Sequence, residues 1–347
     1  MFKYTTSLVF TTLLTLSSVA FAQDVKEPDP IKVNVLLRPK MITDFASKQN
    51  SMDFDLSGIR VERVINDNIS GIIYPGFARS SANVNSSSIN NDMLTFVLIE
   101  GYFNFKDVTK NYGDAGLGMK VGQFTVPFYN VEQSYQPFRF IYKPLDYKMM
   151  PTNFADLGVM LHRPIADNMV DIWLGYVTGA GIWNSELRSD DLNDNVNAGC
   201  LLLTTSFFPF KKGSDAIKDL SLTFNLKAVA RTSARSSYNF LLGYKYSSLA
   251  TSVEYLNTYS TNRSKDLTAT SFGISYDVYG PFQAIGRWDY SDNNSAAVHL
   301  DHLFLIGVNT KWQKGAIQAS LTYDQDYDPA AKKAIAKRLM LATQFYY

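Results

Sequence analysis

The stretch LMLATQFYY at residues 339–347 decides how this chain folds. Consecutive side chains of a β-strand point to opposite faces, so a strand here gathers every second residue on one face. One face carries Leu339, Leu341, Thr343, Phe345 and Tyr347, and the other carries Arg338, Met340, Ala342, Gln344 and Tyr346. A largely apolar face that ends on aromatic residues is suited to contact lipid.

This C-terminal stretch resembles the terminal strand of outer-membrane β-barrels, and the N-terminus agrees with export. Lys3 precedes an apolar run from Leu8 to Leu16, and the small-residue site Ala20-Phe21-Ala22 follows it. This order predicts a signal peptide, residues 1–22, that is cleaved after Ala22. The alternative is a retained helical anchor, but the run is shorter than the roughly 20 apolar residues that span a bilayer. Residues 23–347 are then expected to form a single domain.

Composition and charge exclude several classes of protein. The chain has 33 basic and 32 acidic residues, and removing Lys3 with the signal peptide leaves 32 of each. This balance argues against a nucleic-acid-binding protein, which concentrates basic residues. The single cysteine, Cys200, cannot form an intramolecular disulfide, and no spacing suggests a zinc site. With aromatic residues at 14% of the chain, a soluble all-β exoprotein or a transmembrane barrel remains.

Alternation in the body of the chain favours the barrel, because only a barrel needs apolar residues outside and polar residues inside on strand after strand. Between residues 220 and 231, Leu222, Phe224 and Leu226 fall on one face. Ser221, Thr223 and Asn225 fall on the other. The pattern predicts about sixteen antiparallel strands. They lie near residues 32–46, 52–65, 69–79, 93–105, 116–124, 156–163, 169–179, 196–208, 219–231, 237–247, 250–259, 268–279, 281–290, 300–311, 315–326 and 337–347.

The connections between these segments alternate in length. If both termini face the periplasm, the connections after even-numbered strands should be turns, and residues 66–68, 247–249 and 279–281 are short. The connections after odd-numbered strands include the longest loops, at residues 80–91, 125–155 and 179–195. This alternation is typical of a transmembrane barrel with short periplasmic turns and long outer loops.

The segment from Thr125 to Ala155 is the longest of these loops and is rich in proline and aromatic residues. Because such a loop gains nothing from floating in water, we expect it to fold into the barrel and narrow it. A lid on the outer surface is the alternative. The expected constriction residues are Arg139, Lys143, Lys148, Glu132 and Tyr135.

Part of the sequence resembles the phosphate-selective porin O and P family. The motif VGQFTVPF at residues 121–128 is the most specific part, and it is followed by DLGV at 156–159 and LGYVTGAG at 174–181. The resemblance is clear over about residues 52–184. It implies a sixteen-stranded porin, often trimeric, with the third outer loop folded inside.

Selectivity is harder to predict, because phosphate-selective members of that family line their channel with many basic residues and this chain is balanced. The basic residues expected to face the lumen are Arg38, Lys40, Lys120, Lys227, Arg231, Lys245, Arg287 and Arg338. The acidic ones are Glu100, Asp171, Asp277, Asp289 and Asp324. This count predicts a modestly basic lumen that favours anions. The orientation of Arg60 stays open, because it shares parity with the apolar Phe54 and Leu56 unless a bulge intervenes.

The function that follows is passage of small hydrophilic solutes, with a mild preference for anions such as phosphate, through the outer membrane of a Gram-negative bacterium. Sixteen strands enclose more space than inward side chains fill. The expected contacts are small solutes, outer-membrane lipid and two further copies in a homotrimer. No cofactor, metal or enzymatic activity is expected, because no serine-hydrolase turn accompanies the three histidines. The alternative is a non-conducting structural or adhesive barrel that binds partners through its outer loops.

Overall fold

The computed structural model describes residues 31–54, 57–79, 94–108, 116–135, 155–166, 169–178, 200–208, 219–229, 236–259, 267–293, 301–312, 317–328 and 333–346. The expected signal peptide, residues 1–22, lies outside this part of the chain. The strands in it are β1 (Lys32–Leu37), β2 (Pro39–Asp44), β3 (Gln49–Phe54), β4 (Ser57–Asn66), β5 (Ile69–Arg79), β6 (Leu94–Phe105), β7 (Gly118–Thr125), β8 (Ala155–Ile165), β9 (Val170–Val177), β10 (Cys200–Phe207), β11 (Asp219–Val229), β12 (Ser236–Tyr246), β13 (Leu249–Tyr259), β14 (Leu267–Tyr279), β15 (Phe282–Asn293), β16 (Asp301–Trp312), β17 (Ile317–Asp328) and β18 (Lys333–Tyr346). Within the same residues the helix is α2 (Pro127–Tyr135).

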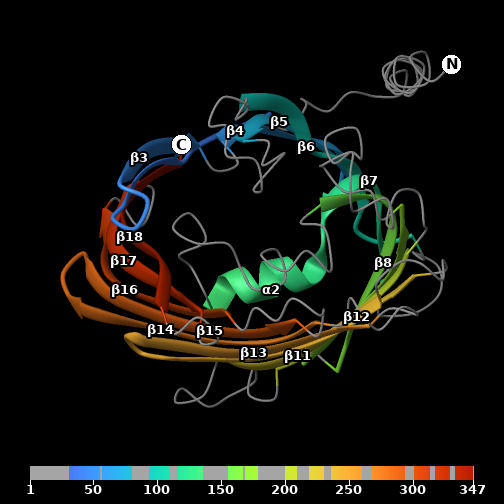
Figure 1. Ribbon diagram of the computed structural model, residues 1–347. Helices are drawn as coiled ribbons and strands as arrows, with labels where there is room; N and C mark the ends of the chain where they lie inside the picture. Colours follow the sequence, from blue (N-terminus) through green and yellow to red (C-terminus); the bar gives the residue numbers. More distant parts are fainter. Residues whose placement is uncertain are drawn as a thin grey trace, which may run out of the picture.

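The strands form one closed antiparallel β-barrel (Figure 1). β1 and β2 follow each other along one position of the wall, since both pair with β18, and β3 and β4 follow each other along the next. The eighteen segments therefore occupy sixteen positions, as the sequence predicts. The barrel closes where β18 pairs with β2, with Leu341 opposite Met41, and where its end pairs with β1. Closure leaves no free sheet edge within the membrane, where an unpaired backbone group is costly.

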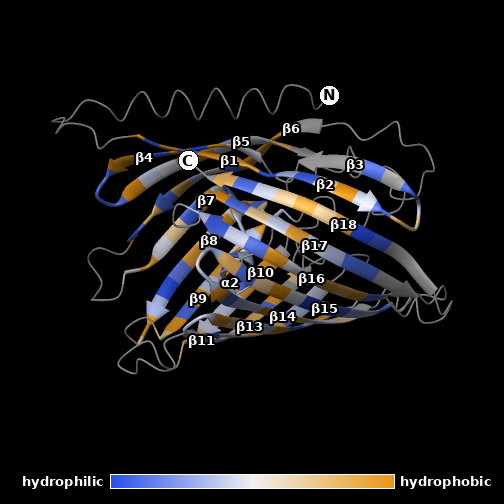
Figure 2. Cartoon of the chain, turned by 90° about the vertical axis from the view of Figure 1, so that its left-hand side faces the viewer, coloured by the Kyte–Doolittle hydropathy of each residue, from blue (hydrophilic) through white to orange (hydrophobic). Residues whose placement is uncertain are grey.

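The wall is apolar outside and polar inside, which confirms the alternation read from the sequence. On β11, Leu222 is 50% exposed, whereas its neighbours Ser221 and Thr223 are buried. On β18, Leu339 and Leu341 are exposed, and Met340 and Ala342 are buried. Figure 2 shows hydrophilic and hydrophobic residues alternating along the strands. In water this arrangement would expose a band of apolar side chains, so the outer face is suited to lipid.

Short turns join the strands at one end of the barrel, which we call the turn end. β12 and β13 are joined by Ser247 and Ser248, and β14 and β15 are joined by Gly280 and Pro281. Ser247 and Gly280 have φ values of 51° and 56°, the left-handed conformation that two-residue hairpin turns require. The longer connections lie at the opposite end, which we call the loop end.

The predicted strand set differs from the observed one mainly in the first two strands, each of which is divided into two segments. β1 ends at Leu37 and β2 begins at Pro39, whose ring removes a backbone hydrogen-bond donor. In the part of the chain that the structure describes, no helix has both the length and the apolar character to cross a membrane.

Candidate functional site

Helix α2 lies inside the ring of strands (Figure 1). It begins at Pro127, two residues after β7 ends, and proline is well suited to the first turn of a helix. The helix contacts β11, β12 and β13. It is the first part of the segment 125–155 that was expected to fold into the barrel, and residues 136–154 of that segment lie outside the described residues.

The ring of Tyr135 is seated on Gly243 of β12. A Cβ atom at Gly243 would lie only 2.4 Å from two ring atoms of Tyr135, so the absent side chain makes room for the tyrosine. The Nζ atom of Lys245, two residues along β12, lies 5.2 Å from the centroid of the same ring. Tyr135 and Lys245, both expected near the channel, are therefore brought together by a cation–π contact.

One face of α2 is buried and the opposite face is exposed. Phe128, Glu132 and Tyr135 are buried at spacings of four and three residues, which places them on one helical face. Asn130 and Ser134 are exposed. We expected Glu132 to face water in the pore, but its side chain is fully buried, because helix formation puts it on the same face as Phe128 and Tyr135.

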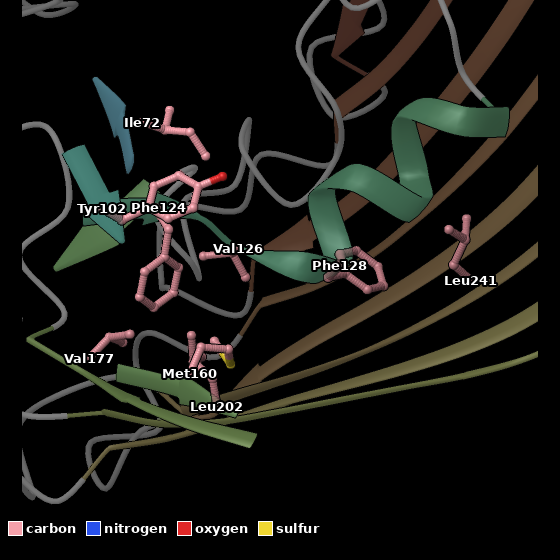
Figure 3. Close-up of a cluster of buried hydrophobic side chains, with 9 residues drawn as sticks. All are labelled: Ile72, Tyr102, Phe124, Val126, Phe128, Met160, Val177, Leu202 and Leu241. Carbon is pink, nitrogen blue, oxygen red and sulfur yellow. The ribbon is translucent and has the colours of Figure 1, made fainter. Parts of the chain in front are cut away.

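A cluster of apolar side chains fills the interior beside the start of α2 (Figure 3). Phe128 of the helix and Val126 before it pack with side chains from seven strands of the wall. These are Ile72, Tyr102, Phe124, Met160, Val177, Leu202 and Leu241. The sequence pattern did not reveal this cluster, because it treats the inward face as uniformly polar. The apolar contacts fix the start of α2 against the wall and leave the polar residues of the interior to line the remaining space.

A group of charges on β4 and β6 faces the lumen near this cluster. The Nε atom of Arg60 lies 3.4 Å from a carboxylate oxygen of Glu100, and its Nη1 atom lies 3.1 Å from one of Glu62. Thr125 of β7 donates a hydrogen bond to Glu100. These contacts resolve the orientation of Arg60, which points inward. Neither Glu62 nor the inward turn of Arg60 was predicted.

Ion pairs also line the wall from β15 to β18. Arg338 donates hydrogen bonds from Nε and Nη2 to both carboxylate oxygens of Asp324, the shortest at 2.6 Å. Arg287 and Asp289 are 2.7 Å apart at their closest, with side chains only 1% exposed. Such bidentate or buried pairs hold their side chains in one arrangement. They also cancel much of the charge that each residue would otherwise present to the lumen.

Near the turn end, Lys120, Trp173 and His162 form a second group. The Nζ atom of Lys120 lies 4.9 Å from the centroid of the Trp173 ring and 5.3 Å from that of Tyr102. The His162 and Trp173 rings stack, with centroids 3.8 Å apart. Asp171 lies beside His162, with Nε2 and Oδ1 3.7 Å apart.

Most of the basic residues expected in the lumen occupy inward positions. Arg38 binds the side chain of Gln344, and Lys40 shares its face with Ile42, which packs inward. Lys227 pairs with Ser237 at an inward register position, although its side chain is outside the described part of the chain. Arg231, Arg139, Lys143 and Lys148 also lie outside it.

The expected excess of basic charge on the wall is not found among the described residues. Asp44, Glu62, Asp156 and Glu254 also sit at inward positions, in addition to the acidic residues that were predicted. The sequence signal for Glu254 is weak, because its face also carries the apolar Leu256 and the opposite face carries Asn257. The described wall is therefore close to balanced, with most of its charges in pairs.

Comparison with known proteins identifies the fold. No protein-family profile and no curated protein sequence matches this chain. Three solved structures match over almost their whole length. They are the outer-membrane channel DcaP of Acinetobacter baumannii (10% identity, 94% of this chain and 99% of that chain, TM-score 0.59), an anion-selective porin from Comamonas acidovorans (11%, 92% and 99%, 0.59) and the outer-membrane protein OmpT of Vibrio cholerae in a trimer form (13%, 92% and 99%, 0.52).

The fold is that of the outer-membrane porins. At these low identities the match extends to the architecture alone.

Proposed function

We propose that this protein is an outer-membrane porin that forms a water-filled diffusion channel for small hydrophilic solutes. The observation that carries the proposal is the closed barrel of sixteen strand positions with polar residues inside and apolar residues outside. A barrel of this size encloses more space than inward side chains fill. The polar Asn130 and Ser134 face of α2 supports a hydrated space on that side of the helix.

The channel has a mild preference for anions such as phosphate, as in the porin family that residues 52–184 resemble. Because the described wall pairs most of its charges, we assign this preference to Arg139, Lys143 and Lys148 of the third outer loop. These three residues follow α2 in sequence, and α2 starts the loop inside the barrel. A cation in the narrowest part of a pore raises the local concentration of anions more than one in its wide mouth.

The protein resides in the outer membrane of a Gram-negative bacterium after cleavage of residues 1–22, and three copies associate. The exposed apolar band on the outer wall supports a membrane location. A trimer form among the structurally similar proteins supports the oligomer. Chemical crosslinking of the detergent-purified protein tests the trimer, and N-terminal sequencing tests the cleavage after Ala22.

Planar-bilayer recording tests the proposed channel directly. The purified protein should give stable single-channel steps, and the reversal potential in a KCl gradient should show a mild anion preference. Replacing Arg139, Lys143 and Lys148 together by alanine should reduce that preference. The matched control replaces Arg63 and Arg163 by alanine, because both are exposed basic residues on the outward face of the wall.

The recordings have three informative outcomes. Absence of conductance from correctly folded protein would exclude the diffusion channel and favour the structural or adhesive barrel. A cation-selective reversal potential would exclude the anion preference but leave the channel. An unchanged preference in the triple variant would place the selective charges outside the third loop.

A further inference from the structure

The three histidines of this chain differ in where they lie on the barrel. His162 is on β8 and shares its inward face with Met160, which is fully buried inside the barrel. His302 is on β16 and shares the outward face with Phe304, and its ring lies 5.0 Å from the Tyr290 ring. His299 lies outside the described residues. Among the described histidines, only His162 therefore faces the lumen.

His162 lies near the turn end of the channel wall. β8 ends three residues later at Ile165, and β9 starts at Val170. His162 is directly opposite Trp173 in the register of these two strands, and their rings stack with an interplanar angle of 15°. Stacking fixes the imidazole against the wall, so a change in its charge occurs at a defined place in the lumen.

Groups on both neighbouring strands act on the charge of His162. From β9, Asp171 lies 3.7 Å from Nε2, a distance at which a protonated imidazole forms an ion pair. From β7, Lys120 lies on Trp173 and opposes protonation through its positive charge, and Tyr102 of β6 packs beside Lys120. With His162 neutral, Lys120 and Asp171 cancel each other. With His162 protonated, the group carries one net positive charge.

We propose that His162 is a pH-dependent determinant of charge selectivity in this channel. The inference rests on the proposed function, because selectivity has meaning only if the barrel conducts. Histidine is the side chain whose charge ordinarily changes between pH 5 and 8. A unit charge about 10 Å from the pore axis, screened over a similar Debye length, should change the anion-to-cation permeability ratio about twofold.

The test measures reversal potential in a KCl gradient at pH 8.0 and pH 5.5. The wild-type protein should become about twofold more anion-selective at the lower pH. His162→Gln should abolish this change. The control is the double variant His299→Gln/His302→Gln, which keeps His162 and should respond like the wild type.

A second measurement reports protonation of His162 independently of conduction. An imidazolium stacked on an indole quenches its fluorescence, so tryptophan emission should fall on acidification by an amount that His162→Gln removes. Asp171→Asn should move the midpoint of this fall to lower pH, because it removes the charge that favours the protonated ring. A residue with only a structural role would not shift this midpoint. Retention of the folded, heat-modifiable band in gel electrophoresis shows that each variant has formed the barrel.

The outcomes separate this inference from the proposed function. Conductance without any pH-dependent selectivity, or with a pH response that survives His162→Gln, overturns the role of His162 and leaves the channel intact. A fluorescence change without a selectivity change also overturns it, because His162 would then titrate without acting on ions. Absence of conductance at every pH removes the channel itself and this inference with it.

Discussion

Replacing Gly243 by alanine should disturb the seat of α2 on the barrel wall. The new Cβ would lie 2.4 Å from Cγ and Cδ2 of Tyr135, whereas ordinary contacts begin at 3.4 Å, so about 1 Å of displacement is required. Cγ is the base of the ring, so rotation of the ring alone does not relieve the overlap. The helix end must move away from β12 and toward the centre of the lumen. Overpacking of this kind costs about 1–3 kcal/mol.

The assay is urea unfolding of the refolded barrel in lipid vesicles, with single-channel conductance as a second readout. Gly243→Ala should lower the free energy of unfolding by that amount and reduce the conductance. The matched control is Gly71→Ala, whose Cβ would meet its nearest atom, in Phe103, at an ordinary 3.6 Å. It should leave the stability within about 1 kcal/mol of the wild type.

A double variant shows whether Tyr135 is the cause. In the Tyr135→Ala background the ring is absent, so Gly243→Ala should cost close to nothing, and the difference between the two backgrounds is the coupling energy. If Gly243→Ala is as costly without the tyrosine as with it, or costs nothing in the wild type, then the tyrosine is not seated on Gly243 and the reasoning fails.

Three further predictions follow from the same structure. Arg338→Ala leaves the buried Asp324 carboxylate without its bidentate partner and should destabilise the barrel by about 3–5 kcal/mol in urea unfolding. The double variant with Asp324→Ala should recover part of this loss, and no recovery would argue against the pair. Leu222→Arg, on the lipid-facing side of β11, should cost about 2–4 kcal/mol, and a cost no larger than that of Leu222→Ala would contradict the assigned face. Phe128→Ala should weaken the docking of α2 by about 3–5 kcal/mol, and Leu241→Cys, in a Cys200→Ser background, should then react faster with a thiol reagent; an unchanged rate would contradict the contact.

The charged wall illustrates what sequence patterns can and cannot give. Parity along a strand places Arg338 and Asp324 on the inward face, and both predictions are confirmed. Parity does not reveal that the two residues are opposite each other on β17 and β18, because the register between strands depends on pairing along their whole length. Arg60 was ambiguous for a related reason, since β3 and β4 are separate segments and the parity of one does not carry over to the other.

The sequence by itself determined the barrel, its sixteen strand positions and the direction of its two faces. Each of these depends on local alternation, and lipid outside with water inside imposes that alternation on every strand. Only the tertiary structure decided that Tyr135 is seated on Gly243, that Glu132 is buried and that His162 stacks on Trp173. Contacts between α2 and β12 join residues that lie far apart along the chain. Such contacts depend on how the barrel closes and how the helix enters it, and no periodicity in the sequence records either.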